Sequence, residues 1–298
     1  MKKNIFLLWL QGWEKAPWLQ KEVLESWIIN NPDWTVNLID QNNLVNYVND
    51  IDYIYDKNKI ITPQAKSDII RLSLLKNYGG VWADSTLLCM QPLSHWFFDA
   101  VSKSGMWMYH GHGAFLKSDL GPASWFIISK KNGYLISKWK KACDSFWMKN
   151  YKAKDYFWMD GLFKNLIEKE AKFKNQWLDT PFLYCEEIGS SHTLANYNFG
   201  IQNDTKLVKE ILDTKPPYVL KLPSNFKKIF PKLDSKKFKN SNVFFAISIS
   251  KRKYIYRHDF VQPISVYSPY KRNLILRLCF KVMRKLISIF MIKKLYMT

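Results

Sequence analysis

The segment at residues 62–84 constrains the fold most, because it predicts a helix, a glycine stop and a buried strand in direct succession. Thr62 is a favourable N-cap, and Pro63 suits the first helical position, where its missing N–H would be unpaired in any case. Gly79 supplies the left-handed residue that typically closes a helix. The apolar run at 81–83 then predicts a short buried strand.

Three charged residues of this segment are placed for ligand binding. Asp84 falls where the strand emerges from the sheet, and in open α/β sheets ligands bind outside the carboxyl ends of strands. Asp68 and Arg71 are three residues apart, so a helix brings them to one face and to one ligand. The alternatives are a turn-capping role for Asp84 and a structural salt bridge between Asp68 and Arg71, which is compatible with binding.

The remaining pattern predicts an α/β fold, with a parallel sheet covered by helices. Strands are expected at residues 4–11, 34–40 and 80–83, and helices at 18–30, 41–50 and 63–78. Further along, we expect strands with a glycine-containing loop at 105–128, helices at 134–149 and 160–172, and a loop at 214–243. No internal repeat or long linker divides the chain, which predicts one catalytic domain at residues 1–260 and a tail at 261–298.

The motifs S-D-x-x-R at residues 67–71 and Y-G-G at 78–80 resemble the sugar-nucleotide motif of the bacterial capsular polysaccharide synthesis glycosyltransferases. That group belongs with the DXD-containing glycosyltransferases of family 32, which includes Och1-type mannosyltransferases. The D-x-D position reads Asp84-Ser85-Thr86, so Thr86 stands where the family often has a second Asp. Further similarity lies at residues 5–12, 34–40, 124–129 and 155–158.

The resemblance implies a GT-A-like, Rossmann-type nucleotide-sugar-binding sheet and a hexosyltransferase. We expect transfer from a nucleotide sugar, with UDP-galactose as the first donor to test and with retention of anomeric configuration. A divalent cation neutralises a leaving diphosphate as a Lewis acid, and Mn²⁺ or Mg²⁺ prefers oxygen ligands. Asp84 and Thr86 are the expected metal ligands, with Asp84 also beside the ribose. Thr86 offers only a neutral hydroxyl, so a weak metal site or an inactive glycosyltransferase-like scaffold are alternatives.

The other donor contacts follow from the same resemblance. Asp68 is expected to bind sugar or ribose hydroxyls, and Arg71 the diphosphate or Asp84 itself. Lys221 is similar to a lysine late in the family pattern and is expected at the diphosphate.

The resemblance places the nucleotide base at the end of the first strand, where Trp9, Gln11 and Gly12 lie. Glycine permits close backbone approach, and a tryptophan ring can stack on a base. The alternative for Trp9 is a place in the core.

The sequence also offers candidates for an acceptor site and for a third metal ligand. Asp155 and Asp160 flank the aromatic cluster at residues 156–159, and aromatic faces beside carboxylates suit a sugar acceptor. We give Asp160 an acceptor-side role, with a helix N-cap as the alternative. The histidines available as a third metal ligand are His110, His112, His192 and His258.

The net charge of +20 predicts an anionic partner. No acidic residue follows Asp259, and from residue 277 basic positions form one stripe of an amphipathic helix. Its longest uncharged apolar run, residues 286–292, is far shorter than the ~20 residues that span a bilayer, so the tail is expected to lie on an anionic membrane surface. The alternatives are packing on the core and a dimer contact.

We therefore expect a cytoplasmic protein, peripheral on the inner face of the cell membrane, with a lipid-linked saccharide as acceptor. A nucleic-acid-binding protein is the rival interpretation, because basic and aromatic residues can serve single-strand binding. The basic residues concentrate in the last third of the chain instead of interleaving with aromatics, so no nucleic acid partner is expected.

Overall fold

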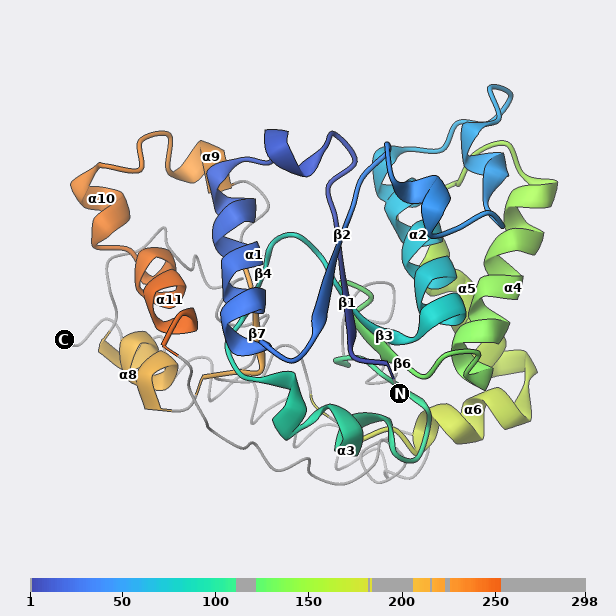
Figure 1. Cartoon of the computed structure of the whole chain (residues 1–298). Helices are drawn as coiled ribbons and strands as arrows, with labels where there is room; N and C mark the ends of the chain where they lie inside the picture. The colour runs from blue at the N-terminus through green and yellow to red at the C-terminus, as the bar shows by residue number, and fades with distance from the viewer. Residues whose placement is uncertain are drawn as a thin grey trace, which may run out of the picture.

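A computed structural model describes residues 2–110, 122–181, 183, 206–214, 216–222 and 226–252 (Figure 1). The predicted domain boundary at 260, the tail at 261–298 and its amphipathic helix lie outside these residues. Within them, no helix combines the length and the apolar character that crossing a bilayer requires.

Five strands form the main sheet, in the order β2-β1-β3-β6-β5. β1 runs parallel to β2 and β3, whereas β6 is antiparallel to both β3 and β5. The α/β class is confirmed, but the sheet is mixed instead of parallel throughout. The strands are β1 (Asn4–Leu8), β2 (Thr35–Ile39), β3 (Gly80–Ala83), β5 (Met106–Trp107) and β6 (Phe126–Ser129).

Helices cover both sides of this sheet (Figure 1). On one side lie α1 (Trp18–Asn30), α8 (Lys206–Thr214) and α11 (Asn242–Ser250). On the other lie α2 (Pro63–Tyr78), α4 (Tyr134–Lys149), α5 (Trp158–Lys169) and α6 (Ala171–Leu178). The short helices are η1 (Trp13–Lys15), η2 (Leu44–Asn46), η3 (Asp52–Tyr55), η4 (Leu93–His95), α3 (Phe97–Val101), α9 (Phe226–Ile229) and α10 (Lys236–Lys239).

The core is divided by the sheet, because successive side chains of a strand point to opposite faces. Along β1, Ile5 and Leu7 belong to one buried cluster, while Phe6 belongs to the other. In β3 the same alternation places Val81 in the first cluster and Trp82 in the second, the one that also contains residues of α2.

The predicted boundaries of α2 are confirmed. The Thr62 hydroxyl accepts a hydrogen bond from the Ala65 N–H at 3.2 Å. Gly79 and Gly80 have φ values of 67° and 107°, and a Cβ on Gly80 would lie 2.4 Å from the Asn4 carbonyl oxygen. These two glycines therefore let the chain leave α2 and enter β3 directly beside β1.

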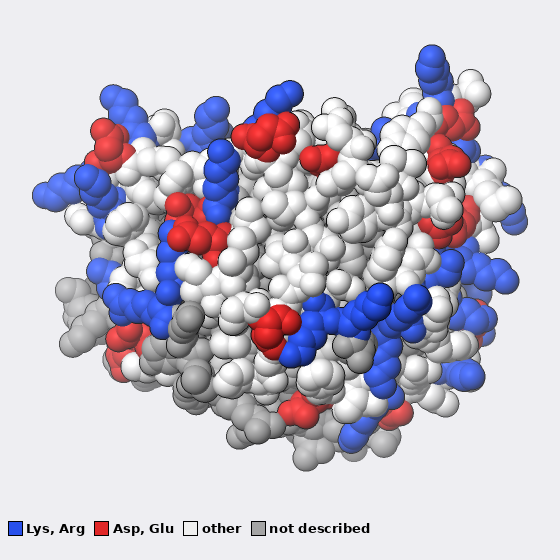
Figure 2. All heavy atoms as spheres, viewed as in Figure 1, with Lys and Arg blue, Asp and Glu red and all other residues white. Residues whose placement is uncertain are grey.

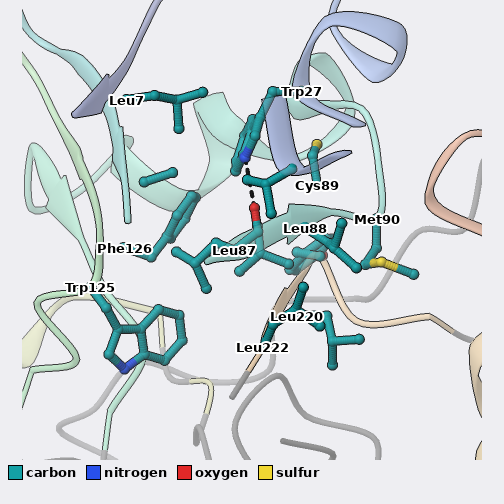
Figure 3. Packing of buried hydrophobic residues seen from close by; sticks show 14 of the residues in the cluster. Leu7, Trp27, Leu87, Leu88, Cys89, Met90, Trp125, Phe126, Leu220 and Leu222 are labelled. Carbon is teal, nitrogen blue, oxygen red and sulfur yellow. Dashed lines mark hydrogen bonds between the residues drawn. The ribbon is translucent and has the colours of Figure 1, made fainter. Parts of the chain in front are cut away.

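A second, two-stranded sheet joins β4 (Leu87–Cys89) to β7 (Val219–Lys221) in antiparallel register. The Trp27 indole N–H donates to the Leu87 carbonyl at 2.8 Å, and the apolar side chains of both strands pack below it (Figure 3). Leu220 and Leu222 are buried in this packing, so strand alternation turns Lys221 to the other face.

Three predicted elements are wrong in type or extent. The expected helix at 41–50 is only the one-turn η2, because the Asp40 carboxylate accepts the backbone N–H groups of Asn42 and Asn43 and holds an Asx turn. The expected helix at 160–172 begins at Trp158 and ends at Lys169, with α6 after it.

The expected loop at 214–243 contains β7, α9, α10 and the start of α11. Ser235 and Ser241 are the N-caps of α10 and α11, each with a side-chain oxygen that accepts a backbone N–H. These helices are short and lysine-rich or uniformly apolar, so the sequence lacks the usual amphipathic period there.

Candidate active site

Asp84 directly follows β3, as predicted, and its backbone is fixed on both sides. Its N–H donates to the Trp125 carbonyl at 2.9 Å, and its own carbonyl accepts from the Leu87 N–H at 2.9 Å. The Trp82 indole N–H donates to Asp84 Oδ1 at 3.0 Å. The turn at residues 84–86 thus presents the carboxylate at the carboxyl end of a central strand.

Two cations converge on this carboxylate from distant parts of the chain. Arg71 Nη2 lies 3.3 Å from Asp84 Oδ1 and 3.1 Å from Asp68 Oδ1. Lys221 Nζ lies 3.0 Å from Asp84 Oδ2. The structure therefore brings Asp68, Arg71, Asp84 and Lys221 together, and we call these four residues the site cluster.

Aromatic rings and backbone oxygens fix the two cations. The Arg71 guanidinium lies over the Trp82 ring, 5.1 Å from its centroid, and Lys221 Nζ lies 6.0 Å from the Trp125 ring centroid. Arg71 Nη1 also donates to the Ser124 carbonyl at 2.6 Å. These contacts orient the positive charges before any ligand binds.

The two carboxylates of the site cluster differ in electrostatics. Burial raises the pKa of Asp68 to about 6, and the negative charge of Asp84 adds to this effect while Arg71 opposes it. Burial also acts to raise the pKa of Asp84, but Lys221 and Arg71 outweigh it and hold that pKa below its ordinary value. Asp84 is therefore firmly ionised, whereas Asp68 titrates close to neutral pH.

The start of α5 lies beside the site cluster. The Trp158 side chain hydrogen-bonds Asp68. Tyr156 is 73% exposed, yet the pKa of its hydroxyl is raised by desolvation and then by the charges of Asp68, Asp84 and Asp160. Asp160 is buried within the first turn of α5, and Phe157 occupies the N-cap position. The alternative of Asp160 as an N-cap is wrong, because the helix begins two residues earlier than its sequence suggested.

The predicted base-binding residues follow β1, the strand next to β3. The Trp9 N–H donates to the Ile39 carbonyl and the Gly12 N–H to the Trp9 carbonyl, both at 3.0 Å. Gly12 has a φ of 94°, Gln11 is exposed, and Trp9 is half-buried against the core. The three residues thus form a tight turn at the carboxyl end of β1.

Comparison with known proteins identifies the family of the chain. Residues 1–252 match the family described as "Capsular polysaccharide synthesis protein". The chain belongs to that family. The expected capsular family is thereby confirmed. The closer relationship to family 32 and Och1-type enzymes stays a prediction, and so does a bacterial source.

Two curated fungal proteins are similar to this capsular polysaccharide synthesis family member. The O-glycosyltransferase braB of Annulohypoxylon truncatum is 33% identical over 95 residues, covering 28% of this chain and 22% of the relative. The glycosyltransferase afumC of Aspergillus fumigatus is 29% identical over 157 residues, covering 49% of this chain and 38% of the relative. The chain thus spans less than half the length of either relative.

One solved structure, the PaToxG glycosyltransferase, is similar over 58% of this chain and 73% of its own, with 14% identity and a TM-score of 0.39.

In this protein, the residues that the structure describes do not by themselves form a divalent-cation site. Both oxygens of Asp84 are already paired with Arg71 and Lys221, and Thr86 adds only a neutral hydroxyl. No group of three or more His, Cys, Asp or Glu side chains suited to a metal occurs in the described part. His110 is fully buried, and burial lowers its pKa to about 3. His112, His192 and His258 lie outside the described residues.

Sequence reasoning gave no site role to Trp82 or Trp125, and it assigned Trp158 to the acceptor side as part of the aromatic cluster at residues 156–159. Trp82 had a detectable signal, because it precedes Asp84 by two residues and so shares its face of the strand. Trp125 had none, since it reaches the site only through the pairing of β6 with β3. The contact of Trp158 with Asp68 was not foreseen, because it depends on the packing of α5.

Proposed function

We propose that this protein is a glycosyltransferase that moves a hexose from a nucleotide sugar to a lipid-linked saccharide during capsular or exopolysaccharide assembly. The observation that carries the proposal is the site cluster, in which Arg71 and Lys221 hold Asp84 at the carboxyl end of β3. Membership of the capsular polysaccharide synthesis family supports it. Two matched relatives bear the name glycosyltransferase, which supports the same reaction class.

The charge arrangement suits a donor with a diphosphate. In glycosyl transfer the bond between the anomeric carbon and the leaving phosphate oxygen breaks, and negative charge grows on the nucleoside diphosphate. Fixed cations aimed at a developing charge stabilise such a transition state. Arg71 and Lys221 lie 3.0–3.3 Å from one carboxylate and are the groups of this chain that would receive the diphosphate.

The carboxylates are suited to the sugar part of the donor. A carboxylate accepts hydrogen bonds at two oxygens, which matches adjacent hydroxyls on a sugar or ribose ring. We assign the sugar hydroxyls to Asp68 and the ribose side to Asp84. The turn at Trp9, Gln11 and Gly12 ends the neighbouring strand and is the proposed contact of the nucleotide base.

The acceptor is proposed to approach from the α5 side. Tyr156, just before α5, has an exposed ring, and the charges of Asp68 and Asp84 act on its hydroxyl. Asp160 lies in the first turn of α5. The acceptor hydroxyl oxygen forms the new bond to the anomeric carbon as the bond to the leaving phosphate oxygen breaks, and the hydroxyl proton passes to the released nucleoside diphosphate. We also propose that the transferred sugar retains its anomeric configuration. UDP-galactose is the first donor to test, and the enzyme is proposed to work at the inner face of the cell membrane.

We propose that Arg71 and Lys221, and not a metal ion, neutralise the negative charge of the diphosphate. The pairing of both Asp84 oxygens leaves Arg71 and Lys221 as the described positive charges at the site. We therefore expect turnover to persist in the presence of a chelator. A complete loss in chelator would instead assign a Mn²⁺ or Mg²⁺ ion to Asp84, Thr86 and ligands outside the described residues.

The test is nucleotide release from a panel of UDP-, GDP- and ADP-sugars, with and without lipid-linked saccharide extracted from membranes. Wild type is compared with Asp84→Asn and with Asp50→Asn, because Asp50 is a half-buried aspartate that pairs with other cations, Lys76 and Lys140. Release from one donor that is lost in Asp84→Asn and kept in Asp50→Asn supports the proposal. Absence of release from every donor with acceptor present would contradict it and favour an inactive scaffold.

A further inference from the structure

The exposed apolar side chains of the described residues are concentrated in one place. Ten large hydrophobic residues are exposed in the described part of the chain, and six of them come from the two segments 55–66 and 148–157. Met148 is 79% exposed and Ile60 is 61% exposed. We call these six the aromatic rim: Tyr55, Ile60, Met148, Tyr151, Tyr156 and Phe157.

The two segments form one continuous surface. The Ile60 N–H donates to the Tyr151 carbonyl at 2.6 Å, and residues 60 and 152 form a parallel bridge. Lys59 Nζ donates to the Trp147 carbonyl at 2.6 Å. In Figure 1 the start of α2 and the end of α4 lie at the same end of these two neighbouring helices, which is the end that carries the two segments. The aromatic rim is therefore held in place although its side chains are exposed.

The aromatic rim borders the active site. Tyr156 is one of its members, and Asp68 and Asp84 raise the pKa of the Tyr156 hydroxyl by their charge, in addition to desolvation. Phe157 is the N-cap residue of α5, the helix whose first residue hydrogen-bonds Asp68. Whatever surface the aromatic rim binds therefore lies next to the site cluster.

The rim is also basic. Its two segments contain six lysines and two acidic residues. Lys66 Nζ lies 5.5 Å from the Tyr55 ring centroid, and Lys152 Nζ lies 5.5 Å from that of Tyr151. Lysine beside tyrosine, phenylalanine and aliphatic side chains is the composition that favours the interface of an anionic bilayer.

Charge decides among the possible occupants of this surface. The chain carries +20 overall, and no acidic residue follows Asp259, so a second copy or the C-terminal segment would meet the rim with charge of the same sign. On the face of the molecule shown in Figure 2, basic side chains lie around the edges and also gather across the lower part of the face. An anionic lipid surface complements both the lysines and the exposed apolar groups.

We infer that the aromatic rim docks on an anionic lipid surface and holds the active site against the bilayer. This goes beyond the proposed reaction, because it assigns membrane contact to the catalytic body and not to the C-terminal tail. Docking needs no turnover, so its test is independent of the identity of the sugar donor.

The experiment measures binding of the full chain to vesicles of phosphatidylcholine, with and without phosphatidylglycerol. The rim variant combines Ile60→Ser, Met148→Ser and Tyr151→Ser. The matched control combines Ile28→Ser and Phe98→Ser, which remove exposed apolar groups from α1 and α3. Thermal unfolding of each variant shows that the fold is kept.

Wild type is expected to bind the phosphatidylglycerol vesicles, with partitioning about tenfold or more weaker in the rim variant and unchanged in the control. Lys152→Glu with Lys154→Glu is expected to weaken binding at least about fivefold for each lysine. Equal binding by wild type and the rim variant would overturn the inference and place the contact elsewhere, for example in the tail. Absence of wild-type binding to these vesicles would also overturn it.

Discussion

Two buried cations, each held between two aspartates, mark two different uses of charge in this protein. In the site cluster, Arg71 contacts Asp68 and Asp84. In a second cluster, Lys140 contacts Asp50 at 3.2 Å and Asp144 at 2.7 Å. We call Asp50, Tyr53, Ser73, Lys140 and Asp144 the helix cluster, because it joins η3, α2 and α4.

The helix cluster is satisfied from within. Asp50 receives contacts from Ser73, Lys76 and Lys140, and these lower its pKa although burial alone would raise it. Asp144 accepts the Tyr53 hydroxyl at 2.7 Å in addition to Lys140. Fully paired polar networks of this kind stabilise one arrangement of the surrounding helices.

In the site cluster, by contrast, the aspartates do not each have a full set of partners among the described residues. Asp68 shares Arg71 with Asp84, and its pKa is raised to about 6. A buried ionisable group left in an unfavourable environment beside specific charges is typical of a functional site. The difference between the clusters therefore separates charge that stabilises the fold from charge kept for a ligand.

The largest effect is expected from the helix cluster. Lys140→Met leaves Asp50 and Asp144 without their shared cation and should lower the free energy of unfolding by about 3–5 kcal/mol. Urea denaturation measures this, with the exposed Lys164→Met as the control that changes it by less than about 0.5 kcal/mol. A Lys140→Met protein as stable as wild type would remove the structural role assigned to this cluster.

Lys221→Met should act mainly on catalysis. We expect donor turnover to fall about 10²–10³-fold, the loss typical when one charge-stabilising donor is removed. The free energy of unfolding should fall less than in Lys140→Met, because Lys221 helps to hold the pKa of Asp84 low but is itself partly exposed. Lys221→Arg keeps the charge and should recover part of the rate. Turnover equal to wild type in Lys221→Met would exclude this lysine from the diphosphate site.

Asp68→Asn should increase stability while it removes activity. The folded-state pKa of Asp68 is about 6 against an ordinary 3.8, so ionisation opposes folding above pH 6 and has no effect below pH 3.8, where the carboxyl is protonated in both states. The variant should therefore be more stable than wild type by up to about 3 kcal/mol at pH 8, a difference that disappears near pH 3.5.

Chemical denaturation at the two pH values tests this sign. If Asp68→Asn were less stable than wild type at pH 8, Asp68 would belong with the satisfied carboxylates of the helix cluster.

The smallest effect is expected at Tyr156. Tyr156→Ala removes an exposed ring from the acceptor side and should raise the acceptor KM about tenfold, with kcat and donor KM nearly unchanged. Tyr156→Phe keeps the ring and should stay close to wild type. A change confined to donor KM would move Tyr156 to the donor side of the site.

The sequence predicted α2 and β3 because their signals are local. The Thr62 cap, the glycine stop and the three-residue spacing of Asp68 and Arg71 all lie within one short segment. The contact between Lys221 and Asp84 joins residues 137 positions apart and depends on β7 pairing with β4. Only the family resemblance pointed to Lys221.

The helix cluster shows the limit of sequence reasoning. Helical periodicity places Lys140 on the buried face of α4, four residues after Ile136 and three before Cys143, but it does not identify the carboxylates that pair with this lysine. Its partner Asp50 lies in the stretch where a helix was wrongly predicted at 41–50. Charged partners supplied by different elements become visible only once those elements are packed.

The most direct test of the central claim is calorimetric binding of nucleoside diphosphates to wild type, Lys221→Met and Lys76→Met. Lys76 is the matched control, because it is a partly exposed lysine 3.7 Å from an aspartate of the helix cluster. We predict that one of UDP, GDP and ADP binds wild type and Lys76→Met alike, and Lys221→Met at least about tenfold more weakly. Equal binding by all three proteins, or binding by none, would contradict the assignment of the site cluster to the donor diphosphate.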